Sequence, residues 1–200
     1  MLYKMLTDRI LNHLATNTSI DMGHREIYAY SLERYISGFV NFIVFAIVAA
    51  ICGIPVETVV FGIFYGPLRK YAGGYHAKTR SKCMVLSIFI LLSLVKLAEG
   101  LVLLSYWKLL AVIFLLIAGL LIFWLAPVDS ENRRLSEEVK KQYRRKSRWI
   151  FAVDCLFIIL TVACLESFGN YILIGSLAVF LEGIFLVPHK LTMRQKYAPR

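Results

Sequence analysis

Long apolar runs set the strongest limit on what this 200-residue chain can fold into. Several of them approach about 20 residues, the length that an α-helix needs to cross a bilayer. The clearest run, 109–126, contains no charged residue and ends at Pro127. Hydrophobic residues make up 58% of the sequence, which is more than soluble domains carry. The sequence therefore predicts an all-α fold, a polytopic integral membrane helical bundle.

An amphipathic helix is predicted before the first apolar run. Leu2, Leu6, Ile10 and Leu14 recur every four positions with polar residues between them. Such a helix can lie in the membrane interface with its apolar side down, so we expect residues 1–35 to form interfacial helices. An ordinary helix packed on the others would explain the same pattern.

The number of full crossings depends on a short segment. The run 38–54 ends at Pro55, a residue that kinks or ends a helix. The next run, 56–66, is too short for an ordinary span, so it crosses a thinned bilayer or enters and returns as a re-entrant segment. We expect about six membrane segments, with four full crossings plus re-entrant pieces as the alternative. The whole chain, 1–200, is predicted to be one domain.

The charge balance predicts an orientation. Lys and Arg number 23 against 13 Asp and Glu, a net charge of +10, which in a soluble protein would suggest nucleic acid. Here the cations flank apolar runs, so we expect a lipid bilayer and no nucleic acid as the partner. Most of them lie in the central stretch 69–83, in a loop at 129–148 and after Pro188. We expect the protein to lie in the cell membrane. Because cytoplasmic loops are rich in Lys and Arg, we also expect the central stretch, a basic loop 129–148 and both termini to lie on the cytoplasmic side. An acidic substrate or anionic lipid is a second interpretation of these charges.

The central stretch also contains the one cysteine with polar neighbours. The other three cysteines lie within apolar runs, and no CxxC or CxxH pair indicates a metal site. Thr79 or Ser81 would cap the following helix, which places Cys83 in its first turn, where N–H groups and nearby cations favour a thiolate. His76 is the candidate base that takes the thiol proton.

The spacing of His76 and Cys83 restricts how this pair could work. On one straight helix, residues seven apart are separated by about 10 Å along the axis. A direct hydrogen bond needs about 3 Å, so the segment between them cannot be one helix. Gly73 and Gly74 can supply a turn before His76, and we therefore expect a catalytic loop over 67–83. The alternative is a basic loop whose His and Cys both face water.

The stretch RKYAGGYHAKTRSKC, 69–83, resembles the catalytic loop of the AgrB family, the accessory gene regulator membrane endopeptidases of Gram-positive quorum sensing. The segments APVDSEN and LEGIFLVP, with the basic loop between them, resemble the corresponding family segments. Arg133-Arg134-Leu135 departs from the family, where a Lys-Pro-like pair is expected. The resemblance implies that His76 and Cys83 form a catalytic dyad and that Arg69 and Gly74 are needed for activity.

The same resemblance implies the substrate and the chemistry. The substrate would be a precursor signal peptide with an amphipathic leader, a core containing Cys or Ser, and an acidic tail. Cys83 would release the tail through an acyl-enzyme, and the core would then close into a thiolactone or lactone. The resemblance also suggests a homodimer, and neither a cofactor nor a metal is expected. The cations that would attract the tail are Arg69, Lys70, Lys78, Arg80 and those of the loop Arg133–Arg148. The other supporting residues are Gly73, Gly74 and Glu33.

Several acidic residues leave alternatives open. Asp154 and Glu182 lie within apolar runs, where either could orient His76, although acids there more often pair with a cation or stay protonated. Glu33 could pair with a central cation. Lys96 and Glu99 are three apart and should pair on one helix face. A small peptide exporter and a non-catalytic membrane scaffold are the alternative functions, and neither explains the His–Cys arrangement.

Overall fold

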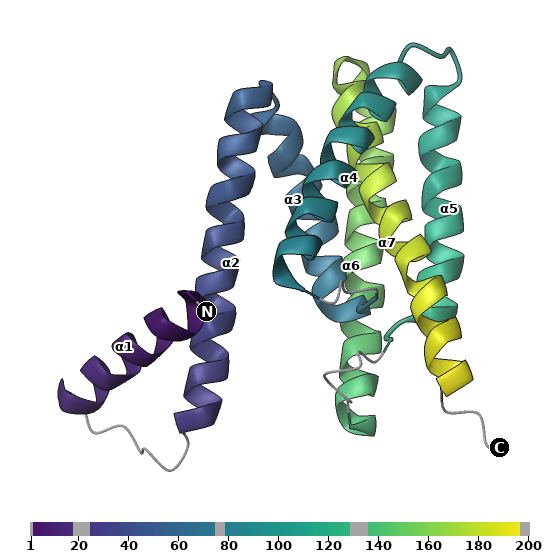
Figure 1. Ribbon diagram of the computed structural model, residues 1–200. Coiled ribbons are helices and arrows are strands. Elements are labelled where there is room, and N and C mark those ends of the chain that lie inside the picture. Colours follow the sequence, from purple (N-terminus) through teal and green to yellow (C-terminus); the bar gives the residue numbers. More distant parts are fainter. Residues whose placement is uncertain (1, 18–24, 75–78, 129–135, 197–200) are drawn as a thin grey trace. The chain divides into compact units, whose positions relative to one another are not determined.

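The computed structural model describes residues 2–17, 25–74, 79–128 and 136–196, and all the regular elements in these ranges are helices (Figure 1). Its elements are α1 Leu2–Asn17, α2 Arg25–Cys52, α3 Pro55–Ala72, α4 Arg80–Leu101, α5 Trp107–Leu125, α6 Glu137–Cys164, the short 3-10 helix η2 Glu166–Phe168, and α7 Gly169–Lys196. The predicted all-α class is confirmed.

Five of these helices are long and apolar enough to cross a membrane: α2, α4, α5, α6 and α7. The prediction of a polytopic membrane protein is therefore confirmed. The short run 56–66 lies within α3, whose last turn contains Arg69 and Lys70. Each predicted membrane segment thus corresponds to one helix, with α3 as the sixth and shortest.

Two compact units divide the chain, residues 1–53 and 54–200. In the first unit α1 packs on α2. Arg25 at the start of α2 donates to the Asn12 side chain at 3.0 Å and lies 3.5 Å from Asp8. The expected amphipathic helix is therefore present, held to the next helix by polar contacts. That the two units act as one domain stays a prediction.

In the second unit α7 is the central helix. It contacts α3, α4, α5 and α6, and its buried residues include Leu173, Ile174 and Leu186. Small residues allow this close packing: a Cβ at Gly175 would lie 3.0 Å from the Phe64 ring on α3. Helices in membranes associate through such small residues, because lipid contributes little hydrophobic force between them.

The break between α2 and α3 follows from Pro55, as predicted. Helix α2 ends at Cys52, Gly53 adopts φ +70°, and Pro55 opens α3 within its first turn. Proline suits that position because its missing N–H would have no partner there.

Both segments predicted as long loops are largely helical in their described residues. Residues 137–148 of the expected basic loop form the first turns of α6, where Ser136 accepts from Val139 N at 3.4 Å and caps a first turn containing Glu137 and Glu138. Of the expected catalytic loop 67–83, only 73–79 lies between helices. Helix α3 passes through Pro67, because Phe64, Leu68 and Ala72 continue one buried face to the end of the helix.

Candidate functional site

Arg69, in the last turn of α3, is held by α7. Its side chain is only 15% exposed, and its Nη1 lies 3.3 Å from Oε2 of Glu182, which is fully buried. The same nitrogen donates to the carbonyl oxygen of Gly73 at 3.0 Å. The guanidinium also lies over two aromatic rings, with its carbon 6.0 Å from the Tyr65 centroid and 5.7 Å from that of Phe185. A guanidinium with contacts of this kind on several sides has a fixed position.

The glycine pair after α3 is required by the space around it. Gly73 and Gly74 have φ of +85° and +117°, in the region that side chains disfavour. A Cβ at Gly73 would lie 2.5 Å from the Val128 carbonyl oxygen, and one at Gly74 only 2.3 Å from Nη1 of Arg69. A side chain at residue 74 would therefore displace the Arg69 guanidinium. This is a physical reason for the Arg69–Gly74 combination, while its need for activity stays a prediction.

A backbone contact joins this corner to the segment after α5. Val128 N donates to Ala72 O at 2.9 Å, so the chain leaving α5 runs against the end of α3. Sequence reasoning did not single out Val128, because its contribution comes from backbone atoms.

Cys83 lies in the first turn of α4, as predicted. Thr79 is the N-cap residue, and its side chain accepts from Lys82 N at 3.3 Å. The Cys83 N–H donates to Thr79 O at 3.0 Å, and the cysteine is half-buried. The positive end of the helix dipole at this turn favours an anion. Helix α4 contacts α3, whose last turn contains Arg69.

Several predicted site residues fall outside the described part of the structure. His76 and Lys78 lie outside the described residues, and Arg80 begins α4 with a side chain that is likewise outside them. The His76–Cys83 dyad therefore stays a prediction. Glu33 lies in α2, in the other unit, and its predicted supporting role also stays a prediction.

Lys70 is exposed and belongs to a cluster between α3 and α6. Its Nζ lies 5.4 Å from the Tyr71 ring centroid, and Nζ of Lys146 lies 5.1 Å from the same centroid. Tyr71 packs edge-to-face on Tyr143 with ring centroids 5.4 Å apart. Lys70 is thus a surface cation next to Arg69 in the sequence. Among the described residues, it makes no contact with Glu182, the carboxylate that pairs with Arg69.

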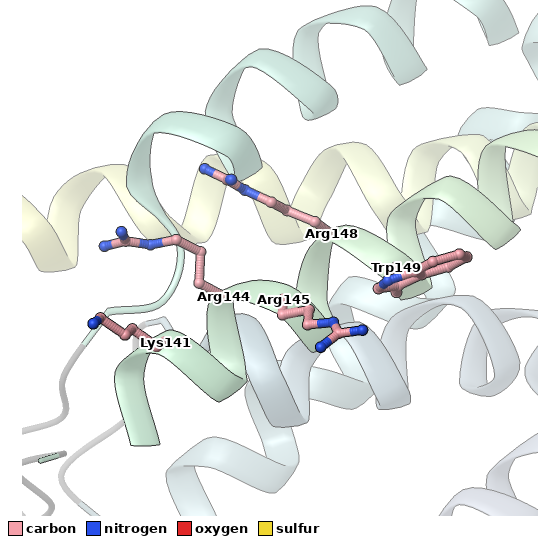
Figure 2. A pocket seen from close by; sticks show the side chains of 5 residues that line it. All are labelled: Lys141, Arg144, Arg145, Arg148 and Trp149. Atoms are coloured by element: carbon pink, nitrogen blue, oxygen red, sulfur yellow. The ribbon is translucent and has the colours of Figure 1, made fainter. Parts of the chain in front are cut away.

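A cationic groove runs along the first turns of α6. Two adjoining hollows of about 330 and 500 Å³ share Arg144 and Arg148. In Figure 2 the side chains of Lys141, Arg144 and Arg148 extend to the same side of α6. Arg148 also donates to the carbonyl of Phe123 at 3.0 Å, which ties the groove to the end of α5. The residues that line the groove are Phe123–Val128, Glu137, Lys140, Lys141, Arg144, Arg145, Arg148 and Trp149.

This groove adjoins the glycine corner through one residue. Val128 lines the larger hollow, and its backbone also contacts Ala72 and Gly73. An anionic group bound in the groove would therefore be held close to the end of α3.

The two buried acids differ in their partners. Glu182 pairs with a cation, as acids in apolar segments were expected to do, and the partner is Arg69. Asp154 in α6 is 8% exposed, and its Oδ2 has no hydrogen-bond partner among the described residues. The expected Lys96–Glu99 pair is also present, at 2.7 Å.

The sequence contains a signal for the Arg69–Glu182 pair. Glu182 interrupts an apolar run, and Arg69 ends one, so each ionised group needs a partner within the protein. The match between them was not predictable from spacing, because they are 113 residues apart.

The five long apolar helices, with the Arg69-anchored glycine corner at the end of α3, define a multi-pass membrane protein. Residues 7–186 match the family model of accessory gene regulator B, AgrB. The match covers most of the chain, and the protein therefore belongs to the AgrB family.

Curated relatives agree with this assignment. The chain is 28% identical to protein FsrB of Enterococcus faecalis strain OG1RF, over 92% of this chain and 74% of that protein. It is 24% identical to an AgrB-like protein of Clostridium perfringens strain SM101, over 84% of this chain and 79% of the relative. A second AgrB-like protein, from C. perfringens strain 13, is 23% identical over 78% of this chain and 72% of that protein. No solved structure matches the chain.

Proposed function

We propose that this protein is a membrane cysteine endopeptidase that removes the acidic C-terminal tail of a precursor signal peptide and promotes its cyclisation. Membership of the AgrB family supports this reaction class. The observation that supports the proposal is the position of Cys83 in the first turn of a helix capped by Thr79. Arg69 holds the backbone of Gly73, which precedes that helix in the sequence. In the sequence His76 follows Gly74 by two residues and precedes the Thr79 cap by three.

The proposed reaction has two acyl transfers. His76 takes the proton from the Cys83 thiol, and the sulfur attacks the carbonyl carbon that joins core and tail. The C–N bond breaks, His76 returns the proton to the departing amine, and the core remains bound to Cys83 as a thioester. A Cys or Ser of the core then attacks the thioester carbon and closes the ring. The proton of that nucleophile returns to the Cys83 sulfur, so the enzyme is regenerated.

A thioester conserves the energy that ring closure needs, provided that water does not reach it first. Cys83 is half-buried and begins a helix that is long and apolar enough to enter the bilayer. Partial exclusion of water at such a position would favour cyclisation over hydrolysis.

The cationic groove is the proposed binding surface for the acidic tail. Its three aligned cations, Lys141, Arg144 and Arg148, offer the charge that an acidic peptide requires. The contact of Val128 with Gly73 brings this groove next to the corner that leads to Cys83. Lys70, Lys78 and Arg80 would add to the same field.

We further propose that the basic segments and both termini face the cytoplasm, because Lys and Arg concentrate there. A homodimer with a shared cavity is part of the proposal and rests on the family resemblance.

The test uses purified protein in lipid vesicles with a peptide that has an amphipathic leader and an acidic tail. Mass spectrometry would follow the peptide with wild type, Cys83→Ala and His76→Ala, and with Cys164→Ala as a matched cysteine control. We expect wild type and Cys164→Ala to release the tail and both site variants to lose activity. A peptide lacking its core nucleophile should leave an acyl adduct on Cys83.

Equal processing by wild type and Cys83→Ala would overturn the cysteine mechanism. A peptide exporter or scaffold would instead retain its function in Cys83→Ser, so transport into the vesicles by that variant separates the classes.

A further inference from the structure

We infer that Glu182 is a positioning residue for the proposed peptidase, and that it acts through Arg69 on the glycine corner that leads to Cys83. The inference rests on the proposed function for its catalytic consequence. Its structural part, that Glu182 holds the corner in place, stands on contacts within the described residues alone.

One nitrogen atom links the central helix to the backbone of the site. Nη1 of Arg69 lies 3.3 Å from Oε2 of Glu182 on α7 and donates to Gly73 O at 3.0 Å on the other side. The empty Cβ position of Gly74 lies 2.3 Å from this same nitrogen. Any movement of the guanidinium therefore changes the support of both glycines at once.

Glu182 is fully buried on α7, the membrane helix with the most buried apolar stretch. Its carboxylate is therefore held in place by the surrounding packing. Phe185, one turn further on α7, contacts the same corner: its ring lies 5.7 Å from the guanidinium carbon, and its carbonyl oxygen would be 3.3 Å from a Cβ at Gly74. The last turn of α3 and the glycine pair are thus both set against one turn of α7.

The geometry is poorly suited to a purely stabilising role. Oε1 of Glu182 is buried and has no hydrogen-bond partner among the described residues. Leaving such an acceptor unsatisfied costs stability, and a buried ion pair often stabilises no more than apolar residues of similar volume would. The presence of an ion pair with these costs is better explained by a second role, which is to fix the position of Arg69.

Glu182→Gln is the informative variant, because it retains the shape and removes the charge. The amide oxygen can still accept a hydrogen bond from Arg69, but the charge attraction is lost, so we expect the guanidinium to hold Gly73 less firmly. The proposed tail-binding groove on α6 does not include Glu182, so binding of the peptide should persist while the chemical step slows. A misplacement of about 1 Å at a reacting centre can reduce the rate by about 100-fold.

Asp154→Asn is the matched control. Asp154 is also a buried acid within a membrane-spanning helix, and the change likewise replaces a carboxyl by an amide. No described contact joins it to Arg69. Glu182→Asp tests rescue, because it restores the charge on a side chain one carbon shorter.

The experiment compares wild type and these three variants in vesicles by two measurements. The first is kcat and KM for an acidic-tailed peptide. The second is hydrogen exchange of the backbone amides of residues 73, 74 and 79–83, which needs no substrate. We expect Glu182→Gln to lower kcat by about 10- to 100-fold, to change KM by less than about 3-fold and to speed exchange at these amides. Glu182→Asp should recover part of both effects, and Asp154→Asn should resemble wild type.

The inference is overturned if Glu182→Gln exchanges at these amides like wild type, or if Asp154→Asn shows the same losses as Glu182→Gln. Failure of the proposed function looks different. If Cys83→Ala processes the peptide as well as wild type, the peptidase proposal fails, and the exchange data alone then decide whether Glu182 holds the corner.

Discussion

Helices α7 and α2 are equally long and similarly apolar, yet they pack differently within their own units: α7 contacts α3, α4, α5 and α6, whereas α2 contacts α1. Each has 28 residues, and each contains a stretch apolar enough to cross a membrane. In that stretch 61% of the α7 residues are buried, against 6% for α2. Gly175 and Gly183 let neighbouring side chains approach α7 closely, whereas α2 exposes large side chains such as Phe42 and Ile51.

The overall apolarity of a helix therefore indicates that it can cross a membrane. It does not indicate whether the helix packs against other helices or against lipid. The distinguishing features are small residues at close contacts and a buried acid with a cationic partner, both of which α7 has. Exposed Phe and Ile side chains on α2 are suited to lipid. Three predictions test this difference. The first two each compare a buried position on α7 with an exposed position on α2, and the third concerns an exposed ion pair.

The largest effect is expected from truncating isomeric side chains on the two helices. Leu173 on α7 is 0% exposed and Ile51 on α2 is 79% exposed. Leu173→Ala should lower the free energy of unfolding by about 2–5 kcal/mol, because it leaves a cavity. Ile51→Ala should change it by less than about 0.5 kcal/mol, as exposed substitutions usually do. Unfolding of the purified protein in mixed micelles would measure both, and equal losses would remove the distinction between the helices.

A smaller effect is expected from adding volume at a glycine. A Cβ at Gly175 on α7 would meet the Phe64 ring at 3.0 Å, while Gly38 on α2 has nothing within 4 Å. Gly175→Leu should destabilise the fold by about 1–3 kcal/mol through overpacking. Gly38→Leu should be neutral or stabilising, because leucine favours helix more than glycine does. Thermal unfolding in detergent would show both shifts, and a stabilising Gly175→Leu would contradict the packing described here.

The smallest effect is expected from an exposed ion pair, in contrast to the buried Arg69–Glu182 pair. Lys96 and Glu99 pair at 2.7 Å on α4 with largely exposed side chains. Glu99→Gln should lower stability by no more than about 0.5 kcal/mol, and 1 M salt should abolish the difference. A larger, salt-insensitive loss would mean that the pair is shielded within an assembly.

The sequence predicted the helices well because apolar length and helix-ending residues are local properties. Pro55 separated α2 from α3, Thr79 capped α4, and the run 109–126 became α5 almost to the residue. The helical start of α6 was not predicted, since its charges were interpreted only as a loop. The cap signal Ser136-Glu137-Glu138 was present and would have identified that start.

The site was predictable in its parts but not in its arrangement. The motif singled out Arg69, the glycine pair and Cys83, and the structure gives Arg69 and the glycines a shared geometry. The partner on α7 and the backbone contact with Val128 depend on how distant helices pack. Spacing along a chain contains no information of that kind. The roles of His76 and Lys78 stay predictions from the sequence.

The guanidinium of Arg69 occupies the space that a side chain at residue 74 would need, and its charge matches that of Glu182. In evolutionary terms, we therefore expect positions 69, 74 and 182 to change together, although they are far apart in the gene. A change at one of them alters the space or the charge at the other two. Sequences that diverge from this one should retain all three residues or replace them together.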